Sequence, residues 1–311
     1  MKNETSESFK ANDAASYDSV ADDFERLTQQ VTLPVAAKML ELARLDGGSR
    51  VLDVGCGTGV LTRLAAKRAS NGAHFLGVDL SDGLLAKARA LSLAEGLDRH
   101  LEFRKSDAEA LELADASVDA VLSVYALRHF PNPRQALREM VRVLRPGGRA
   151  VVAVGSAPPF GSLAFIAAAG RVVLERVQLA LGRGPLHATA FLDGLLDDYL
   201  GHARREEDAE WTQGSDRFSG SVSSMMREVG FTRVQTEWVG ETFYLDSAAA
   251  FWTLQATLST RARKRIAVAS GQQVARLKQA FDDICKHHLA RGGKLIYRSG
   301  ALIAIGERPP A

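Results

Sequence analysis

The sequence predicts an α/β protein with a doubly wound, mostly parallel sheet, and three observations support this prediction. Short apolar segments alternate with helical segments between residues 50 and 155, which is the pattern of βαβ units. A glycine-rich turn follows the first apolar segment, and acidic residues follow the next two. The expected strands are 51–54, 74–80, 101–105, 118–124 and 150–154.

The string VLDVGCGTG, residues 51–59, is the most informative part of the chain. Its aliphatic residues suit a strand that is covered on both faces of a parallel sheet. Gly55, Gly57 and Gly59 free the backbone for a tight turn and for close approach of a ligand. A helix is expected to open beside this turn, from Thr58 to Ala69. The string therefore predicts the first part of a nucleotide-binding βαβ unit.

A dinucleotide site is the competing interpretation of this turn. Its fingerprint is G-x-G-x-x-G or G-x-G-x-x-A, and Val60 takes the place of the third small residue here. Asp53 also precedes the turn, where a carboxylate would repel a pyrophosphate but would accept hydrogen bonds from a cationic amino-acid group. The string therefore favours a ligand with ammonium and sulfonium groups over NAD or FAD.

The nine-residue string resembles the first motif of the class I S-adenosylmethionine-dependent methyltransferases. The order and spacing of the later segments match this family over residues 50–155. The resemblance implies a doubly wound, seven-stranded Rossmann-like methyltransferase sheet with helical cap insertions. It also implies an enzyme that uses S-adenosyl-L-methionine as its cofactor and takes a small molecule as its substrate.

Aspartates at the strand ends are the main candidates for cofactor contacts. Asp79 lies about 20 residues beyond the glycine turn, where an acidic group can accept hydrogen bonds from ribose hydroxyls. The resemblance implies that Asp107 contacts the adenine amino group of the cofactor. A single aspartate at a strand end is usually a helix cap or a solvated group, but the carboxyl ends of parallel strands open onto one crevice. The predicted cofactor-binding residues are Asp53, Gly55, Cys56, Gly57, Gly59, Asp79, Leu80, Asp107, Ala108 and Ser123.

Residues 125–130, after the fourth strand, stand where the family places its substrate-side residues. His129 is the candidate general base, because imidazole exchanges a proton near neutral pH; a structural hydrogen bond is the alternative. Arg128 is expected either to neutralise a developing enolate or phenolate or to activate a bound water. The alternative is a salt bridge with Glu139 or with an acid in the cap. The segment is similar to that of the ubiquinone and menaquinone C-methyltransferases, whose active site includes an arginine at the position of Arg128. Those enzymes lack the long insertions of this chain.

An N-terminal helix with an aromatic residue folds over the cofactor in related small-molecule methyltransferases. Tyr17 and Phe24 are therefore candidate lid residues, with packing of the helix onto the sheet as the alternative for both. For Phe24 we expect packing, and Tyr17 is the third catalytic candidate. Two helices are expected between residues 16 and 45, with Pro34 in the first turn of the second.

The chain outside the core divides into a leader, a lid and two insertions. The helical segment 163–181 is apolar around most of its circumference, so it needs cover on more than one face. Core burial is the default expectation, and a pocket wall or a homodimer surface is the alternative. The expected parts are a disordered leader 1–15, a helical lid 16–48, the core 49–155, a cap insertion 156–216, a core helix and strand 217–245, a second cap insertion 246–292, and a last strand and tail 293–311.

Composition agrees with a cytoplasmic enzyme and argues against some other classes. The 311 residues carry a formal net charge of +2, and a nucleic-acid-binding protein would show a concentrated basic face. The basic cluster 261–265 is expected to be a solvated or salt-bridged helix face. Two cysteines make neither a disulfide framework nor a zinc site. We find no metal-ligand pattern, no signal peptide and no apolar run that would insert into a membrane.

The leading hypothesis is methyl transfer by in-line displacement to carbon or oxygen of a small, apolar metabolite, such as an isoprenoid, a quinone or a polyketide-like molecule of secondary metabolism. The alternative is a protein that binds S-adenosylmethionine without methylating, such as a cofactor-bound cyclase or binding protein, because the first motifs report binding and not transfer. An NAD-dependent oxidoreductase is the third hypothesis.

Overall fold

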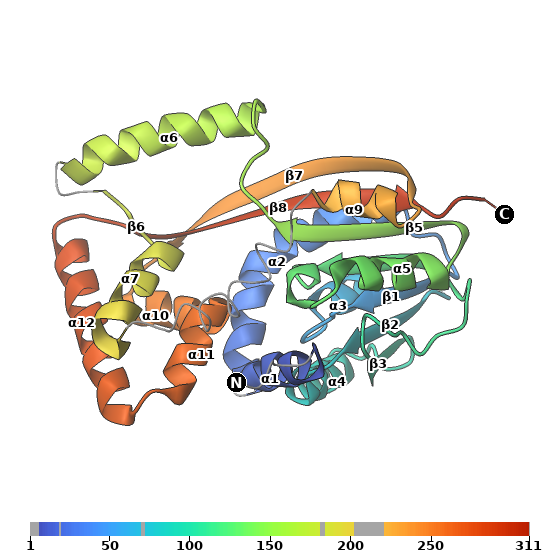
Figure 1. Cartoon of the computed structure of the whole chain (residues 1–311), viewed down its shortest axis with the longest axis horizontal. Helices are drawn as coiled ribbons and strands as arrows, with labels where there is room; N and C mark the ends of the chain where they lie inside the picture. Colours follow the sequence, from blue (N-terminus) through green and yellow to red (C-terminus); the bar gives the residue numbers. More distant parts are fainter. Residues whose placement is uncertain (1–5, 19, 70–71, 181–183, 202–220, 311) are drawn as a thin grey trace. The chain divides into compact units, whose positions relative to one another are not determined.

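The computed structural model describes residues 6–18, 20–69, 72–180, 184–201 and 221–310 (Figure 1). The chain forms two compact units. The first unit comprises Met1–Gly155, Gly214–Val239 and Ala301–Ala311. The second unit comprises Ser156–Gln213 and Gly240–Gly300.

A mostly parallel sheet forms the centre of the first unit. Its strands follow the order β3-β2-β1-β4-β5-β8, β7 pairs with β8, and β5 and β8 are antiparallel. The α/β, doubly wound fold is therefore confirmed. The strands are β1 (Arg50–Val54), β2 (His74–Asp79), β3 (Leu101–Lys105), β4 (Val118–Val124), β5 (Leu144–Gly155), β7 (Thr232–Leu245) and β8 (Leu295–Glu307).

The two faces of the sheet bury different clusters of side chains. Leu52 and Val54 of β1 face one cluster, which includes the apolar side of α5 and Met225 and Met226 of α9. Val51 faces the other cluster, with residues of α2, α3 and α4. Asp53 alternates with Leu52 along the strand and so lies on the α3 side. The helices of this unit are α1 (Ser6–Asp18), α2 (Ala21–Ala43), α3 (Val60–Arg68), α4 (Asp82–Ala94), η1 (Leu127–His129), α5 (Pro133–Val143) and α9 (Val222–Glu228).

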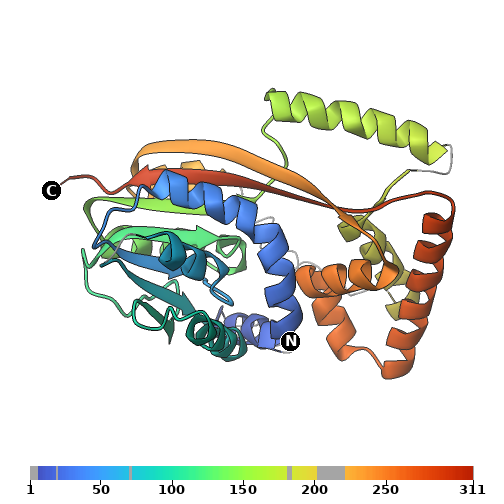
Figure 2. The ribbon, with the colours of Figure 1, turned by 180° about the vertical axis from the view of Figure 1, so that it is seen from behind.

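The N-terminal segment differs from its expected structure in two ways. Residues 6–15 belong to α1, so the expectation of a disordered leader is wrong for this part; residues 1–5 lie outside the described residues. Instead of two helices between residues 16 and 45, α1 ends at Asp18 and α2 continues through Pro34. Because proline lacks an N–H and crowds the preceding turn, it favours the bend of α2 that Figure 2 shows.

The second unit is mainly helical, with an additional short strand. The strand β6 (Leu186–His187) pairs with β8 and brings the sheet to eight strands instead of the expected seven. Phe251 and Phe281 are fully buried beside Phe191. The helices are α6 (Leu163–Ala180), α7 (Ala188–Leu200), α10 (Ala248–Leu258), α11 (Thr260–Val268) and α12 (Gly271–Ala290).

Helix α6 does not meet the expectation of core burial. Its side chains Leu163, Ile166, Val173 and Leu174 are exposed. Polar contacts link the helix to the rest of its unit, because Glu175 forms ion pairs with Arg298 and His187. None of the described helices is long and apolar enough to cross a membrane.

The basic cluster of residues 261–265 is largely internal to the second unit. Arg263 and Arg265 are both only 4% exposed. Arg261 and Arg265 form ion pairs with Asp197, and Arg263 donates to the carbonyl oxygen of Thr257 at 2.8 Å. These arginines therefore form salt bridges and hydrogen bonds inside the fold and do not make a basic surface for nucleic acid.

Gly59→Ala tests whether the glycine turn is fixed by packing. Gly59 has φ +77°, and a Cβ there would lie 2.5 Å from Cζ of Phe103. Gly96 has φ +69° and no atom within 4 Å of its hypothetical Cβ, so Gly96→Ala is a control for backbone strain alone. We expect Gly96→Ala to destabilise the protein by about 1–2 kcal/mol and Gly59→Ala by roughly 1–3 kcal/mol more. Urea unfolding followed by circular dichroism measures both; equal losses would contradict the packing constraint.

Candidate functional site

The turn between β1 and α3 is tied to the neighbouring strand by backbone hydrogen bonds. The N–H groups of Gly55 and Cys56 both donate to the carbonyl oxygen of Val78, at 2.8 and 3.0 Å. Gly55, Gly57 and Gly59 all have positive φ angles, a conformation that glycine adopts without strain. These hydrogen bonds thus fix the turn against β2.

The three glycines of this turn meet different surroundings. A Cβ on Gly55 would lie 2.3 Å from Cβ of Ala126, so packing inside the protein excludes a side chain there, as at Gly59. A Cβ on Gly57 would meet the Phe24 ring at 3.4 Å, which is ordinary contact. Phe24 was expected to pack only against the sheet, but its ring lies over the turn itself.

Asp53 ends β1 as a buried carboxylate that lacks a full set of partners. It is 1% exposed, and its Oδ2 accepts a hydrogen bond from Oγ1 of Thr62 at 2.6 Å. Oδ1 has no hydrogen-bond partner among the described residues. Burial raises the pKa of Asp53 from 3.8 to about 7, and the nearby Asp79 adds to this effect. A cationic ligand group would satisfy both the open acceptor and the charge.

Asp79, at the end of β2, holds the glycine turn. Its Oδ2 accepts from the N–H of Gly57 at 2.9 Å, and its Oδ1 accepts from the N–H of Ser81 at 3.0 Å. Burial raises the pKa of Asp79, although these backbone hydrogen bonds oppose the shift. Each carboxylate oxygen has a second lone pair, so the group retains acceptors for hydroxyl donors. Leu80 follows directly, and the Ser81 hydroxyl caps α4.

Asp107, after β3, contacts a lysine that the sequence analysis did not select. Its Oδ1 accepts from the N–H of Glu109 at 2.9 Å, and its Oδ2 accepts from Nζ of Lys10 at 2.7 Å. Lys10 also donates to Glu109 at 2.8 Å. Burial disfavours the charged ammonium, but these two carboxylates raise the pKa of Lys10 above its usual value. Ala108 is buried beside this contact.

Two of the three catalytic candidates are in contact. The Tyr17 hydroxyl lies 3.4 Å from Nε2 of His129, and the two rings meet edge to face with centroids 5.8 Å apart. The other ring nitrogen, Nδ1, lies 3.2 Å from Oδ2 of Asp13. Phe24 packs edge to face on Tyr17 at 5.2 Å. The structure therefore places Tyr17 and His129 together and adds Asp13 to them.

Helix α1 reaches the ends of three strands through polar side chains. Asp18 accepts from the Ser81 hydroxyl at 2.5 Å and from the N–H of Gly83 at 2.9 Å, beside the end of β2. Lys10 reaches the segment after β3, and Tyr17 reaches His129 after β4. Both views show α1 beside α4 (Figures 1 and 2). Lys10, Asp13 and Tyr17 follow one another at helical spacing, and this polar stripe is the signal that could have identified them.

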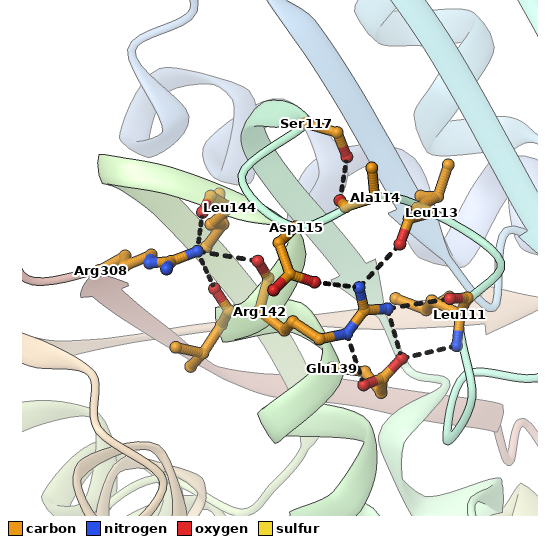
Figure 3. Close-up of polar contacts among 10 residues, drawn as sticks. Leu111, Leu113, Ala114, Asp115, Ser117, Glu139, Arg142, Leu144 and Arg308 are labelled. Carbon is orange, nitrogen blue, oxygen red and sulfur yellow. Dashed lines mark hydrogen bonds and ion pairs between the residues drawn. The ribbon is translucent and has the colours of Figure 1, made fainter.

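Arg128 does not pair with Glu139, so that alternative is wrong. Glu139 forms an ion pair with Arg142 three residues later, which lowers the pKa of Glu139 (Figure 3). Arg142 also donates to the carbonyl oxygens of Leu111 and Leu113, which fixes the loop before β4. Arg128 instead donates to the carbonyl oxygen of Gly155, at the end of β5, at 2.9 Å. Its burial lowers its pKa.

Two predicted cofactor residues, Ser123 and Cys56, have side chains that are buried in the protein. Ser123 is fully buried, and its hydroxyl donates to the carbonyl oxygen of Val54 at 2.8 Å, so its side chain joins β4 to β1. The hydrogen of this hydroxyl is therefore used inside the sheet. Cys56 is buried in the turn, and burial raises the pKa of its thiol well above the usual value. This agrees with its interpretation as a small turn residue and not a nucleophile.

Comparison with known proteins covers the part of the site from the glycine turn to His129. A family model described as a methyltransferase domain matches residues 52–152. Methyltransferase GfsG from Streptomyces halstedii is 37% identical over 141 residues, which cover 45% of this chain and 47% of that protein. Demethylmenaquinone methyltransferase from Thermus thermophilus is 37% identical over 145 residues, which cover 47% of this chain and 63% of that protein. These matches span less than two thirds of the relatives' lengths.

A longer match includes sequence outside this region. The 27-O-demethylrifamycin SV methyltransferase from Amycolatopsis mediterranei is 29% identical over 222 residues, which cover 67% of this chain and 76% of that protein. Among solved structures, the [4+2]-cyclase SpnF has a TM-score of 0.49 at 22% identity, with 89% of this chain and 82% of that chain covered. At this TM-score the structural similarity carries no functional information.

The buried carboxyl of Asp53 gives a pH-dependent stability that can be measured. Its pKa of about 7 in the folded protein exceeds its ordinary value of 3.8. Between these pH values the folded state retains a proton that the unfolded state has lost. The contribution of Asp53 to stability is therefore fully present below about pH 4 and is lost as the pH rises to 7. The loss from this group is on the order of 4 kcal/mol at most.

Asp53→Asn removes this titration and keeps a carbonyl oxygen for the Thr62 hydroxyl. Relative to the variant, the wild-type protein should lose stability between pH 5 and pH 8 in urea unfolding. Asp79 titrates in both proteins, so the difference isolates Asp53. Parallel pH profiles would show that Asp53 ionises normally.

Proposed function

Because residues 52–152 belong to the class I S-adenosylmethionine-dependent methyltransferases, with S-adenosyl-L-methionine as their cofactor, we propose that this chain transfers a methyl group to carbon or oxygen of a small, apolar metabolite. The contact between Tyr17 and His129 carries this proposal, because it provides a proton acceptor at the end of β4. Two of the relatives are named as methyltransferases of demethylmenaquinone and of 27-O-demethylrifamycin SV, which are the acceptors of those enzymes. An isoprenoid, quinone or polyketide-like acceptor is the class we propose here.

The three strand-end aspartates fit the cofactor in the proposed site. Asp53 would accept from its ammonium group, since Oδ1 is buried and open. Asp79 would accept from the ribose hydroxyls. Asp107 would accept from the adenine amino group through a second lone pair, beside its contact with Lys10. Phe24 and Gly57 would border the same space. When bound, the cofactor supplies an electrophilic methyl group on a sulfonium.

The residues around His129 would act on the acceptor. Alignment of the reacting atoms can contribute about 7–11 kcal/mol to such a displacement, and a positioned base adds about 10²–10⁴-fold. Tyr17 and His129 would remove the proton from an acceptor O–H or C–H group. Arg128, half-buried at the ends of β4 and β5, would stabilise an enolate or phenolate as it forms.

A cytoplasmic location belongs to the same proposal. Cys56 and Cys285 are both buried free thiols, which agrees with a reducing compartment.

Methyl transfer can be tested with the full-length chain and methyl-labelled S-adenosylmethionine. We expect label in at least one member of an acceptor set made of a demethylated hydroquinone, an isoprenoid, a polyketide alcohol and a metabolite extract. His129→Asn should lower the rate 10²–10⁴-fold and leave S-adenosylhomocysteine affinity within about twofold in calorimetry. His100→Asn, at an exposed position before β3, is the matched control.

The other outcomes of this experiment separate the alternatives. Tight cofactor binding without label transfer to any acceptor would favour a non-methylating cyclase or binding protein. Binding of NADH without binding of S-adenosylhomocysteine would overturn the proposal as a whole.

Asp79 provides a direct test of cofactor binding. Asp79→Ala should weaken S-adenosylhomocysteine binding at least tenfold, because it removes the ribose acceptor and the hydrogen bond that holds Gly57. Asp79→Asn keeps one carbonyl oxygen and should cause a smaller loss. Asp22→Asn, which removes an exposed carboxylate paired with Lys87, is the control. Unchanged calorimetric affinity in Asp79→Ala would refute the ribose assignment.

A further inference from the structure

We propose that Asp13 is a positioning residue for methyl transfer, which holds His129 through Nδ1 so that Nε2 is the nitrogen that accepts a proton. This inference rests on the proposed function for its catalytic meaning. Its structural content, the protonation state of each ring nitrogen, does not depend on any acceptor.

The contact joins two distant parts of the first unit. Asp13 lies on α1 and His129 on η1, and their side chains meet at 3.2 Å between Oδ2 and Nδ1. The Asp13 side chain is 9% exposed and that of His129 is 35% exposed. The carboxylate is thus shielded from water, while the imidazole remains open to a reacting molecule. A shielded carboxylate interacts more strongly with a hydrogen-bond donor than an exposed one.

One face of α1 contacts both nitrogens of the ring. Asp13 and Tyr17 are four residues apart, so their side chains lie one above the other on the helix. Asp13 meets Nδ1, and the Tyr17 hydroxyl meets Nε2 at 3.4 Å. Lys10 and Asp18 anchor the same helix on either side through other partners. The orientation of the imidazole is therefore set from a helix that is held independently.

The chemistry of the two partners assigns the proton on the ring. A carboxylate only accepts hydrogen bonds, so its neighbour Nδ1 must carry the hydrogen. A neutral imidazole then has its lone pair on Nε2, where it can accept the hydrogen of the Tyr17 hydroxyl. When Nε2 takes up a proton, the ionised Asp13 also stabilises the imidazolium that results.

The proton and electron movements balance in this arrangement. The proton of the acceptor's O–H or C–H group can pass to the Tyr17 oxygen while the Tyr17 hydroxyl proton passes to Nε2. Alternatively, the acceptor's proton passes directly to Nε2. The electron pair left on the acceptor atom forms the new bond to the methyl carbon. The bound cofactor would supply this methyl carbon and would keep the electron pair of its carbon–sulfur bond, so that its sulfonium would leave as a neutral thioether. Asp13 stays ionised throughout.

Asp13→Asn tests this role with little change in size. The amide can donate to Nδ1 and so favours the tautomer with hydrogen on Nε2. We expect kcat to fall at least tenfold while the affinity for S-adenosylhomocysteine stays within twofold. Asp13→Glu, which restores the carboxylate, should recover part of the activity.

Asp22→Asn is the matched control. Lys10→Gln loosens α1 without touching His129, so it should weaken cofactor binding instead of selectively lowering kcat.

Nitrogen-15 NMR of histidine-labelled full-length protein gives the second measurement, with the His129 signals assigned from their loss in His129→Gln. The wild-type protein should show a protonated Nδ1 and a lone pair on Nε2, and Asp13→Asn should reverse them. A protonated Nε2 in the neutral wild-type ring, or identical spectra for the two proteins, would overturn the proposal. A parallel loss of cofactor affinity and kcat in Asp13→Asn would also overturn it, because Asp13 would then only hold the helix. Absence of methyl transfer in the wild-type protein, with the expected spectra, would count against the proposed function and support the tautomer assignment.

Discussion

Negative charge at the carboxyl edge of the parallel sheet is the constraint on which the site depends. Asp53, one residue before the end of β1, and Asp79, at the end of β2, are shielded carboxylates on neighbouring strands, and Asp79 helps to raise the pKa of Asp53. No ion pair joins either of them to a cation among the described residues. Such groups are unfavourable in a fold unless a partner compensates them. A cationic ligand would compensate this charge, as the proposed function requires, and Asp79 also holds the glycine turn.

Helix α1 complements this edge with polar contacts. Lys10 neutralises Asp107, Asp18 accepts from the N–H of Gly83 in the first turn of α4, and Asp13 and Tyr17 contact His129. The helix has only one buried residue, Asp13, among its described side chains. Its position therefore follows from charge and hydrogen bonding, whereas the helices on the faces of the sheet are positioned by apolar packing. In the proposed function, cofactor binding and the orientation of His129 both depend on this helix.

The sequence was sufficient for the central strands and the aspartates that follow them, because apolar runs and glycines report local structure. The sequence did not predict the contacts of α1. These contacts join residues 63 to 116 positions apart, and they require no repeating pattern of apolar residues along the helix. Ser123 was assigned to the cofactor from its place near the strand end, but the alternation of side chains along β4 directs its hydroxyl to Val54. Glu139 was paired with Arg128 by charge alone, and a nearer arginine on the same helix is its partner.

Polar contacts hold α1 at the strand ends. Each hydrogen bond between α1 and the strand ends replaces one with water, so its net contribution is only about 0.5–1.5 kcal/mol. Among the described residues, neither apolar cluster on the faces of the sheet includes a residue of α1. A substitution in α1 can therefore change the position of His129 and leave the buried core of the sheet unchanged.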